Sequence, residues 1–327
     1  MFRTRSFLRY NFDMNKKYVE EIYHRPLKEL VREASRIHAD NFDENKIQLS
    51  TLLSIKTGGC PENCSYCPQS AHYDTGVARK KLMALDEVKS AARNALAGGS
   101  TRFCMGAAWR EVKDGPEFDS VLEMVREVRG LGLEVCCTLG MLNESQAIRL
   151  KEAGLHAYNH NIDTSRNHYA KIISTRTYDD RLKTIENVRK AGVTVCTGGI
   201  IGMGETDEDR IDFLLQLASF DPPPESVTIN ALIPTIGTPL EQQTSATPIE
   251  LARVIATARH LMPHSMIRLS AGRKSMSEEG QFLCFLAGAN SIFLGDTLLT
   301  SANPSIDADK NLLKATGLEP LCHEACQ

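Results

Sequence analysis

Three cysteines lie within eight residues in the segment Cys60-Pro-Glu-Asn-Cys64-Ser-Tyr-Cys67. A closed structural metal site usually takes four protein ligands, whereas an iron–sulfur cluster held by three cysteines leaves one iron free to bind another molecule. The flanking Gly58, Gly59 and Pro61 favour a chain that turns sharply and brings its backbone close to a cofactor. The spacing therefore favours an open iron–sulfur cluster, and the alternative is a zinc loop with His72 as the fourth ligand.

The elements that must position this loop follow a regular alternation along the chain. Short β-branched runs are each followed by an amphipathic stretch of ten or more residues. The expected strands cover 50–56, 101–106, 133–138, 156–162, 193–198, 226–231, 265–270 and 290–294. The expected helices between them cover 86–97, 117–130, 143–153, 178–191, 206–219, 248–261 and 276–287. Eight strands with seven interposed helices predict an α/β fold, a (β/α)8 TIM-type barrel.

Additional helices are expected on either side of the barrel. Residues 15–40 and 305–316 have helical patterns, so we expect an N-terminal helical extension (1–44), a barrel (45–300) and a closing helix with a short tail (301–327). Asp86 and Asn143 are expected N-caps of two barrel helices, and Thr247 with Glu250 is expected to form a capping box. Active sites of such barrels lie at the carboxyl ends of the strands, and the three-cysteine loop directly follows the first one.

The strands also carry a second set of reactive residues on one face. Alternate residues of a strand face opposite sides, and the apolar set should pack on the helices, which leaves the polar set for the lumen of the barrel. The predicted lumen set is Arg102 with Cys104, Glu134 with Cys136 and Thr138, Thr194 with Cys196, and Arg268 with Ser270. Because successive residues of a strand face opposite sides, only one of the neighbours Cys136 and Cys137 can face the lumen. Cys136 shares its face with Glu134, so we expect Cys136 to be the one.

Three cysteines and one arginine from four strands are thus predicted to converge inside the barrel. Taken singly, Cys104, Cys136 and Cys196 are typical small buried residues, and Arg268 is a typical ion-pair partner, for example of Glu134. Their shared parity instead favours a second iron–sulfur centre in the lumen.

Composition limits the other possible functions. The 327 residues carry a net charge of −3 and are 42% hydrophobic, which favours a full core and neither a nucleic-acid nor an anionic-membrane partner. No apolar run approaches the roughly 18 residues of a membrane span. Thiolate-bound clusters need reducing conditions and nothing resembles a secretory signal, so an intracellular protein is expected.

The first residues leave the compartment open. Arg3, Arg5 and Arg9 precede the first acidic residue, Asp13, which hints at an organellar presequence. We expect a bacterial cytoplasmic protein, with mitochondrial import as the alternative and Met14 as a possible second start.

A CxxxCxxC loop after a strand resembles the radical SAM superfamily, and five longer stretches resemble the biotin synthase family within it. These stretches are Lys56–Ser70, Ser100–Trp109, Tyr158–Asp163, Val195–Ile200 and Arg268–Arg273, and the similarity runs from about residue 20 to residue 320. The resemblance implies that dethiobiotin is converted to biotin, with one S-adenosylmethionine (SAM) consumed for each C–S bond. It also implies that an electron cleaves SAM and yields a 5′-deoxyadenosyl radical, which abstracts hydrogen from carbon.

The resemblance also implies how the two centres are held. Cys60, Cys64 and Cys67 would hold a [4Fe–4S] cluster whose open iron chelates SAM. The lumen set would hold a [2Fe–2S] cluster that supplies the sulfur, with Cys104, Cys136, Cys196 and Arg268 as its ligands. These four residues are the ones that strand parity selects without the resemblance.

The contacts to SAM and substrate come partly from the residues and partly from the resemblance. Asn159, Asn161 and Asp163 share one face if the strand continues, opposite His160, and a carboxamide offers both donor and acceptor to a ureido ring. The alternative is a capped strand end at which Asp163 starts a turn. By resemblance, the ureido group would meet Asn159, Asn161 and Asn230. By resemblance, SAM would meet Tyr66, Ala107, Trp109, Asn161, Asp163 and Ile200.

Rival interpretations stay open at this point. A carbon-skeleton mutase or a cluster-maturation enzyme on the same barrel would lack the lumen set, and lipoyl synthase would need a cysteine motif before Cys60, where the chain has none. Outside this superfamily the rival is a zinc-stapled binding module. The resemblance implies a homodimer that works with a flavodoxin or ferredoxin and with iron–sulfur assembly proteins. Cys284 is expected in the core, and Cys322 and Cys326 in a tail of unassigned role.

Overall fold

The computed structural model describes residues 15–322. The arginine-rich start, Met14 as a second start and Cys326 lie outside the described residues and stay predictions, as does the division at 44/45 and 300/301.

Within the described range, eight parallel strands form a closed barrel, which confirms the predicted TIM-type fold. The strands are β1 (Lys46–Lys56), β2 (Arg102–Ala107), β3 (Glu134–Thr138), β4 (Ala157–Asn159), β5 (Thr194–Ile201), β6 (Ser226–Ala231), β7 (Met266–Leu269) and β8 (Ser291–Phe293). Each pairs with the next, and β1 pairs with both β2 and β8, which closes the sheet. A short strand that was not predicted, β9 (Glu319–Pro320), pairs with the amino-terminal end of β1.

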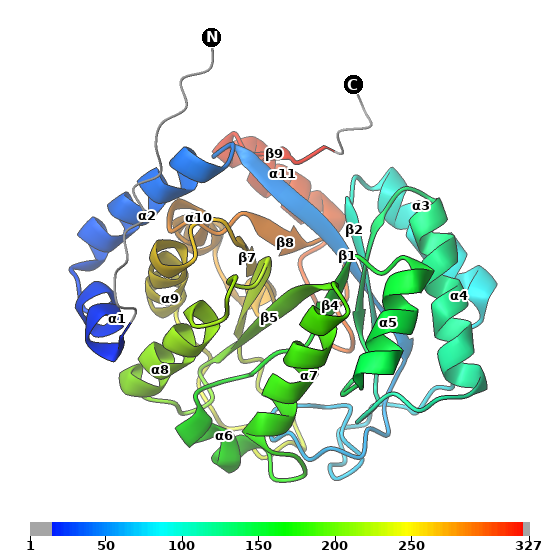
Figure 1. Ribbon diagram of the computed structural model, residues 1–327. Helices are drawn as coiled ribbons and strands as arrows, with labels where there is room; N and C mark the ends of the chain where they lie inside the picture. Colours follow the sequence, from blue (N-terminus) through cyan, green and yellow to red (C-terminus); the bar gives the residue numbers. More distant parts are fainter. Residues whose placement is uncertain (1–14, 323–327) are drawn as a thin grey trace.

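The helices surround this barrel (Figure 1). The ring consists of α3 (Leu85–Ala97), α4 (Pro116–Gly130), α5 (Glu144–Ala153), α6 (Arg166–Ile172), α7 (Tyr178–Lys190), α8 (Asp207–Ala218), α9 (Pro248–Leu261) and α10 (Glu278–Leu286). The extension forms α1 (Lys16–Tyr23) and α2 (Leu27–Asn41), which pack against α8, α9 and α10, and the closing helix is α11 (Ile306–Thr316). Helix α6 and a short 3₁₀ turn (Arg273–Ser275) were not predicted.

Two of the three predicted helix caps are present. Asn143 accepts a hydrogen bond from the backbone of Gln146, and Thr247 forms a capping box with Glu250, as predicted. The prediction of Asp86 as an N-cap is wrong, because α3 already begins at Leu85 and Asp86 lies in its first turn. The start of α3 is instead stabilised by Glu87, whose side chain accepts a hydrogen bond from the backbone N–H of Ala84 at 3.1 Å.

The two faces of the strands separate as period two predicts. Phe103, Met105, Cys137, Val195, Ile267 and Leu269 all belong to the large core between barrel and helices. Cys104, Cys136 and Cys196 instead form a small, separate buried cluster in the lumen with Ala157, Phe293 and Leu298. Cys136 therefore faces inward and its neighbour Cys137 outward, as predicted.

Strand β4 ends earlier than the predicted 162. Asn159 is its last residue, and the backbone N–H of His160 still donates to Cys196 at 2.9 Å. Asp163 then takes the left-handed backbone conformation with φ of 67°, which alternation along a strand does not allow. The run of polar residues after Asn159 is therefore a turning segment over the barrel rather than a continued strand.

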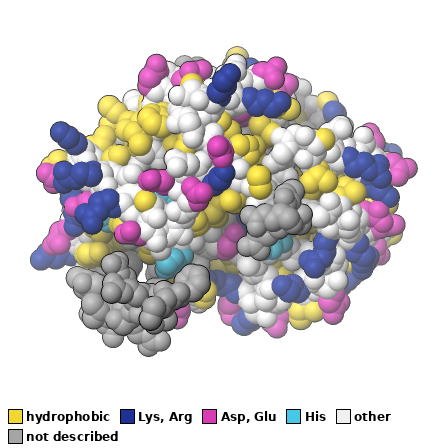
Figure 2. Space-filling view, turned by 90° about the horizontal axis from the view of Figure 1, so that it is seen from above, with side chains coloured by type: hydrophobic (Ala, Val, Ile, Leu, Met, Phe, Trp, Pro, Cys, Tyr) yellow, Lys and Arg dark blue, Asp and Glu magenta, His cyan; other side chains and the backbone are white. Residues whose placement is uncertain are grey.

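The face opposite the cysteine loop shows no segregation of charge. Lys and Arg side chains intermingle there with Asp and Glu (Figure 2). Across residues 15–322, none of the helices combines the length and the apolar character that a membrane crossing requires.

Candidate active site at the carboxyl ends of the strands

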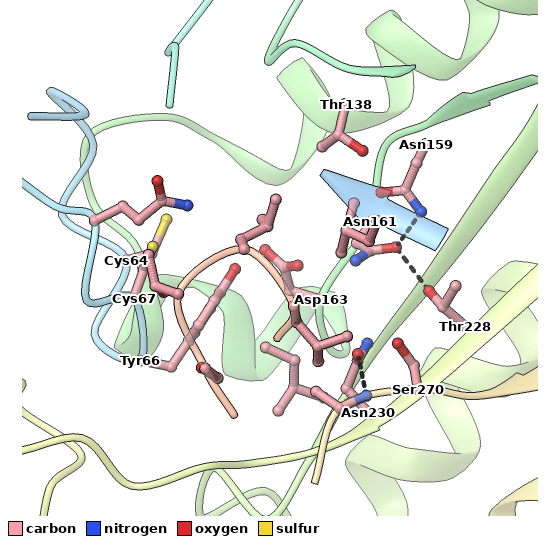
Figure 3. A pocket seen from close by; sticks show the side chains of 18 of the residues that line it. Cys64, Tyr66, Cys67, Thr138, Asn159, Asn161, Asp163, Thr228, Asn230 and Ser270 are labelled. Atoms are coloured by element: carbon pink, nitrogen blue, oxygen red, sulfur yellow. Dashed lines mark hydrogen bonds between the residues drawn. The ribbon is translucent and has the colours of Figure 1, made fainter. Parts of the chain in front are cut away.

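One cavity, with a volume of about 320 Å³, joins the cysteine loop to the lumen. Cys60, Cys64 and Cys67 line it on one side, and Cys104, Cys136 and Arg268 line its deeper part. Figure 3 shows Cys64, Tyr66 and Cys67 on one side of this cavity and Asn159, Asn161, Thr228, Asn230 and Ser270 on the other, with Asp163 between them. Such a cavity is large enough for small-molecule ligands.

The cysteine loop is organised by its own backbone. The N–H of Cys60 donates to Gln69 O at 2.9 Å, and the N–H of Cys67 donates to Cys64 O at 2.9 Å. Gly58 has φ of 71°, and a side chain there would lie 3.1 Å from Ala78 O, so both its conformation and its surroundings require glycine. The predicted sharp turn before the first cysteine is present.

The environment of the three thiols suits a metal centre. Burial raises the pKa of the Cys60 and Cys64 thiols, and that of Cys67 to about 12. Thiols in this setting stay protonated unless a metal displaces the proton, because the thiolate is the ligand form. The loop therefore fits a group that brings its own positive charge.

The geometry does not support the zinc alternative. The Nε2 atom of His72 lies 3.0 Å from Pro61 O, to which it is hydrogen-bonded. In the part of the chain that the structure describes, no three His, Cys, Asp or Glu side chains are grouped as around one metal ion.

The deeper part of the cavity places a buried arginine beside the lumen cysteines. Arg268 is fully buried, and its Nε and one Nη each lie 3.0 Å from a serine hydroxyl, those of Ser291 and Ser50. Its guanidinium lies 4.5 Å from the ring centre of Phe293, a member of the lumen cluster. A hydrogen bond from Cys136 lowers the pKa of the Cys104 thiol against the effect of burial, and the charge of Arg268 acts in the same direction.

The alternative pairing of Arg268 with Glu134 is wrong. Glu134 lies 2.9 Å from Arg102 Nε, and the same guanidinium is 2.8 Å from Glu225. Strand register explains the choice, because Arg102 stands directly opposite Glu134 whereas Arg268 stands opposite Thr228. The neutral hydrogen-bond partners of Arg268 leave its charge directed at the lumen cysteines.

The asparagines predicted to contact SAM and substrate line the cavity, but they differ in the hydrogen bonds that their side chains already make. Asn159 Nδ2 donates to Cys196 Sγ at 3.2 Å, so Cys196, which does not itself line the cavity, lies behind this carboxamide. Asn161 Oδ1 accepts from Thr228 Oγ1 at 2.9 Å (Figure 3). Asn230 bonds backbone groups at both ends of its carboxamide, at 2.9 and 3.1 Å, which leaves one N–H and one lone pair for a ligand.

The remaining predicted SAM residues, Tyr66, Ala107, Trp109 and Ile200, also line this cavity. His160 is buried and its ring stacks on that of Tyr158, with ring centres 6.3 Å apart, but it also borders the cavity and so does not face wholly away from it. Burial lowers the pKa of His160 well below its ordinary value.

Two arginines at the cavity were missed from the sequence. Arg176 and Arg181 line it, and Arg181 forms a buried ion pair with Asp163 and donates to Tyr169 at 3.1 Å. A signal was available, because Arg181 lies one turn after the Thr177 cap of α7. A cation near a helix N-terminus is electrostatically unfavourable and indicates a specific partner.

Comparisons with known proteins agree with this geometry. The model of the Radical SAM superfamily matches residues 54–217, and that of the Biotin and Thiamin Synthesis associated domain matches residues 228–319. The biotin synthase of Myxococcus xanthus is 60% identical over 309 residues, which cover 94% of this chain and 89% of that protein. The biotin synthase of Synechococcus elongatus is 57% identical over 309 residues, covering 94% of this chain and 97% of the relative.

The chain belongs to the biotin synthase family. It is a radical SAM enzyme of biotin synthesis, and membership of this family implies a [4Fe–4S] cluster and SAM as cofactors. The predicted enzyme class is therefore confirmed.

Solved structures with low sequence identity share the barrel. Methylornithine synthase superposes with a TM-score of 0.77 at 20% identity and 95% coverage of both chains. A maturase of the [FeFe]-hydrogenase superposes with a TM-score of 0.81 at 16% identity, covering 95% of this chain and 73% of that one. The fold alone therefore does not separate a biotin synthase from a maturase, and the sequence relatives do.

Proposed function

We propose that this enzyme converts dethiobiotin to biotin by inserting one sulfur atom between a methyl and a methylene carbon. In this proposal Cys60, Cys64 and Cys67 hold the [4Fe–4S] cluster, and a [2Fe–2S] cluster in the lumen is held by Cys104, Cys136, Cys196 and Arg268. The observation that carries it is the buried group of three lumen cysteines, of which Cys104 and Cys136, together with the fully buried Arg268, line the same cavity as the cysteine loop.

The side chains in the lumen fit a [2Fe–2S] cluster. Cys104 on β2 lies directly opposite Cys136 on the neighbouring strand β3, and Cys196 comes from β5, with β4 between them. Their neighbours include the apolar Ala157, Phe293 and Leu298 and the carboxamide of Asn159, and the positive charge of Arg268 favours the thiolate form of Cys104. Arginine is an unusual ligand because it normally offers no lone pair, and we infer that it ligates weakly and eases release of sulfur.

The chemistry of the substrate explains why the two centres would share one cavity. Saturated C–H bonds offer no acidic proton, so a general base is of no use and a carbon radical has to be made. When bound, the [4Fe–4S] cluster would supply the electron that cleaves SAM, and the [2Fe–2S] cluster would supply the sulfur atom. The chain's own contribution would be to hold SAM and dethiobiotin in one cavity and to keep water away from the radical. At the amino end of β2, the buried Arg102 pairs with Glu134 and Glu225, whose side chains are partly exposed.

The polar residues over the barrel orient the two organic ligands. The carboxylate of Asp163, held by Arg181, would accept hydrogen bonds from the ribose hydroxyls of SAM. Asn161 would serve SAM and substrate together, and Tyr66, Ala107, Trp109 and Ile200 would enclose the rest of SAM. Asn159, Asn161 and Asn230 would bind the ureido ring, since each carboxamide offers a donor and an acceptor.

The partners and compartment are part of the proposal. We infer a homodimer that receives electrons from a flavodoxin or ferredoxin and has its lumen cluster rebuilt by iron–sulfur assembly proteins. The resemblance to biotin synthases supports these partners. A bacterial cytoplasm fits the need for reduced thiols, and mitochondrial import is the alternative.

The decisive experiment is anaerobic incubation of the reconstituted enzyme with dethiobiotin, SAM and a reductant, followed by mass spectrometry of the product. Biotin is expected from the native enzyme and from Cys137→Ala. Cys136→Ala should still cleave SAM to 5′-deoxyadenosine but form no biotin, because only the lumen centre is lost. Biotin formation by Cys136→Ala would refute the assignment of the sulfur source.

A further inference from the structure

The cysteine loop is held by a distant segment, residues 172–176, which begins at the last residue of α6. The backbone N–H and the hydroxyl of Ser65 both donate to Ile172 O, at 3.0 and 2.9 Å. Asn63 Oδ1 accepts from the backbone N–H groups of Ser174 and Thr175, at 3.0 and 3.2 Å. The residues between Cys60 and Cys67 therefore have little freedom of their own, and segment 172–176 sets their position.

This segment ends in an arginine directed at one of the cysteines. Arg176 Nη2 lies 3.7 Å from Cys64 Sγ, and both side chains are buried. Arg176 Nε is buried without a hydrogen-bond partner in the described structure, although Glu62 Oε2 lies 3.7 Å away. A buried guanidinium with an unused donor is costly unless a further group accepts from it.

The nearby acid does not cancel the positive charge. Glu62 is 2% exposed and is shared between Arg176 and Arg110, whose Nη1 lies 3.2 Å from Glu62 Oε1. Thr175 Oγ1 donates to the same carboxylate. Two guanidinium groups against one carboxylate leave a net positive charge beside Cys64.

We propose that Arg176 is a positioning residue that donates an N–H to the sulfur of Cys64 and raises the reduction potential of the cluster. The inference rests on the proposed binding of the [4Fe–4S] cluster by Cys60, Cys64 and Cys67. Reduction transfers one electron from the external carrier to the cluster and adds one negative charge to it. A buried cation stabilises that form, and hydrogen bonds to the sulfurs tune such potentials.

The test compares three substitutions in the reconstituted enzyme. Arg176→Met removes both charge and donors, Arg176→Gln keeps a neutral donor, and Arg176→Lys keeps the charge. Arg149→Met is the matched control, since Arg149 lies on α5 and bonds Asp114 and Asp119 outside the cavity. For each variant, iron and sulfide are quantified, and the signal of the reduced [4Fe–4S] cluster is titrated by electron paramagnetic resonance.

The Met and Gln variants are expected to keep the cluster and to disfavour its reduction by about tenfold, a shift of about 59 mV to lower potential for one electron. The Lys variant should shift less, and the control should match the native enzyme. Unchanged potentials in the Met and Gln variants would overturn the inference. Loss of the cluster from all three Arg176 variants would overturn it too, because the role would then be structural.

Failure of the underlying proposal gives a different result. A native enzyme that binds no [4Fe–4S] cluster would refute the cluster assignment itself. A native cluster with variants of unaltered potential refutes only the role of Arg176.

Discussion

The neighbours Cys136 and Cys137 allow the lumen assignment to be tested with a matched pair. They are 1% and 0% exposed, so burial does not distinguish them. Cys136 belongs to the lumen cluster with Cys104 and Cys196, whereas Cys137 packs between the barrel and its helices. Substituting each with alanine should therefore produce opposite effects on cofactor content and on stability.

The sizes of these effects follow from what each sulfur contacts. Cys137→Ala removes one heavy atom from a close-packed core and should lower the free energy of unfolding by about 1–2 kcal/mol, from the lost burial plus a small cavity. Cys136 Sγ borders a cavity that already exists. Its removal should cost the apoprotein less than about 1 kcal/mol, because little additional packing is lost.

The assay combines two measurements on each variant. Iron and sulfide content with the visible absorbance of the reconstituted protein report the clusters, and urea unfolding of the apoprotein reports stability. We expect Cys137→Ala to keep both clusters and unfold at lower urea, and Cys136→Ala to lose the second cluster and unfold almost like the native chain. Loss of the second cluster from Cys137→Ala would refute the strand-parity argument.

Three other predictions concern packing, pH and ligation. Gly198→Ala should destabilise the fold by about 3 kcal/mol, because its new Cβ would lie 1.9 Å from Thr228 O. Gly130→Ala, whose Cβ would have nothing within 4 Å, should be neutral or should stabilise the fold by up to about 1 kcal/mol. Equal melting temperatures for the two variants would contradict this prediction. Burial lowers the pKa of His38 from 6.5 to about 4, so the free energy of unfolding should fall by up to about 3 kcal/mol as the pH drops from 6.5 to about 4. Denaturant titrations across that range should show a shallower fall in His38→Gln, and an identical fall would exclude His38 as a source. Arg268→Lys should still form biotin if the guanidinium serves only as a weak ligand, and complete inactivity in the product assay would show that it does more.

Local pattern was a good guide wherever one side of an element had to be buried. The alternation in β2, β3, β5 and β7 sorted lumen from helix-facing residues correctly, because a one-residue error would expose an apolar face. The same alternation was a poor guide after Asn159, where β4 ends and Asp163 turns into the left-handed region. Asn161 and Asp163 line the cavity nevertheless, brought there by a turn that period two does not describe.

Other errors came from partners that are far apart in the chain. The expected pairing of Glu134 with Arg268 gave way to Arg102, which strand register places opposite it. Helix α6 has only seven residues and no strong periodicity to predict it. Segment 172–176, and with it the contact of Arg176 with Cys64, was therefore not foreseen.

The order of residues along the chain was enough to determine the barrel, the three-cysteine loop after its first strand and the choice of Cys136 over Cys137. These features depend on spacing and on the burial of one face, which are local properties of the polypeptide. Only the tertiary structure decided which charged groups meet, namely Arg181 with Asp163, Arg102 with Glu134, and Arg176 with Glu62 and Cys64. A charged side chain can pair with any opposite charge that the fold brings near, so its partner depends on strand register and loop path rather than on sequence distance.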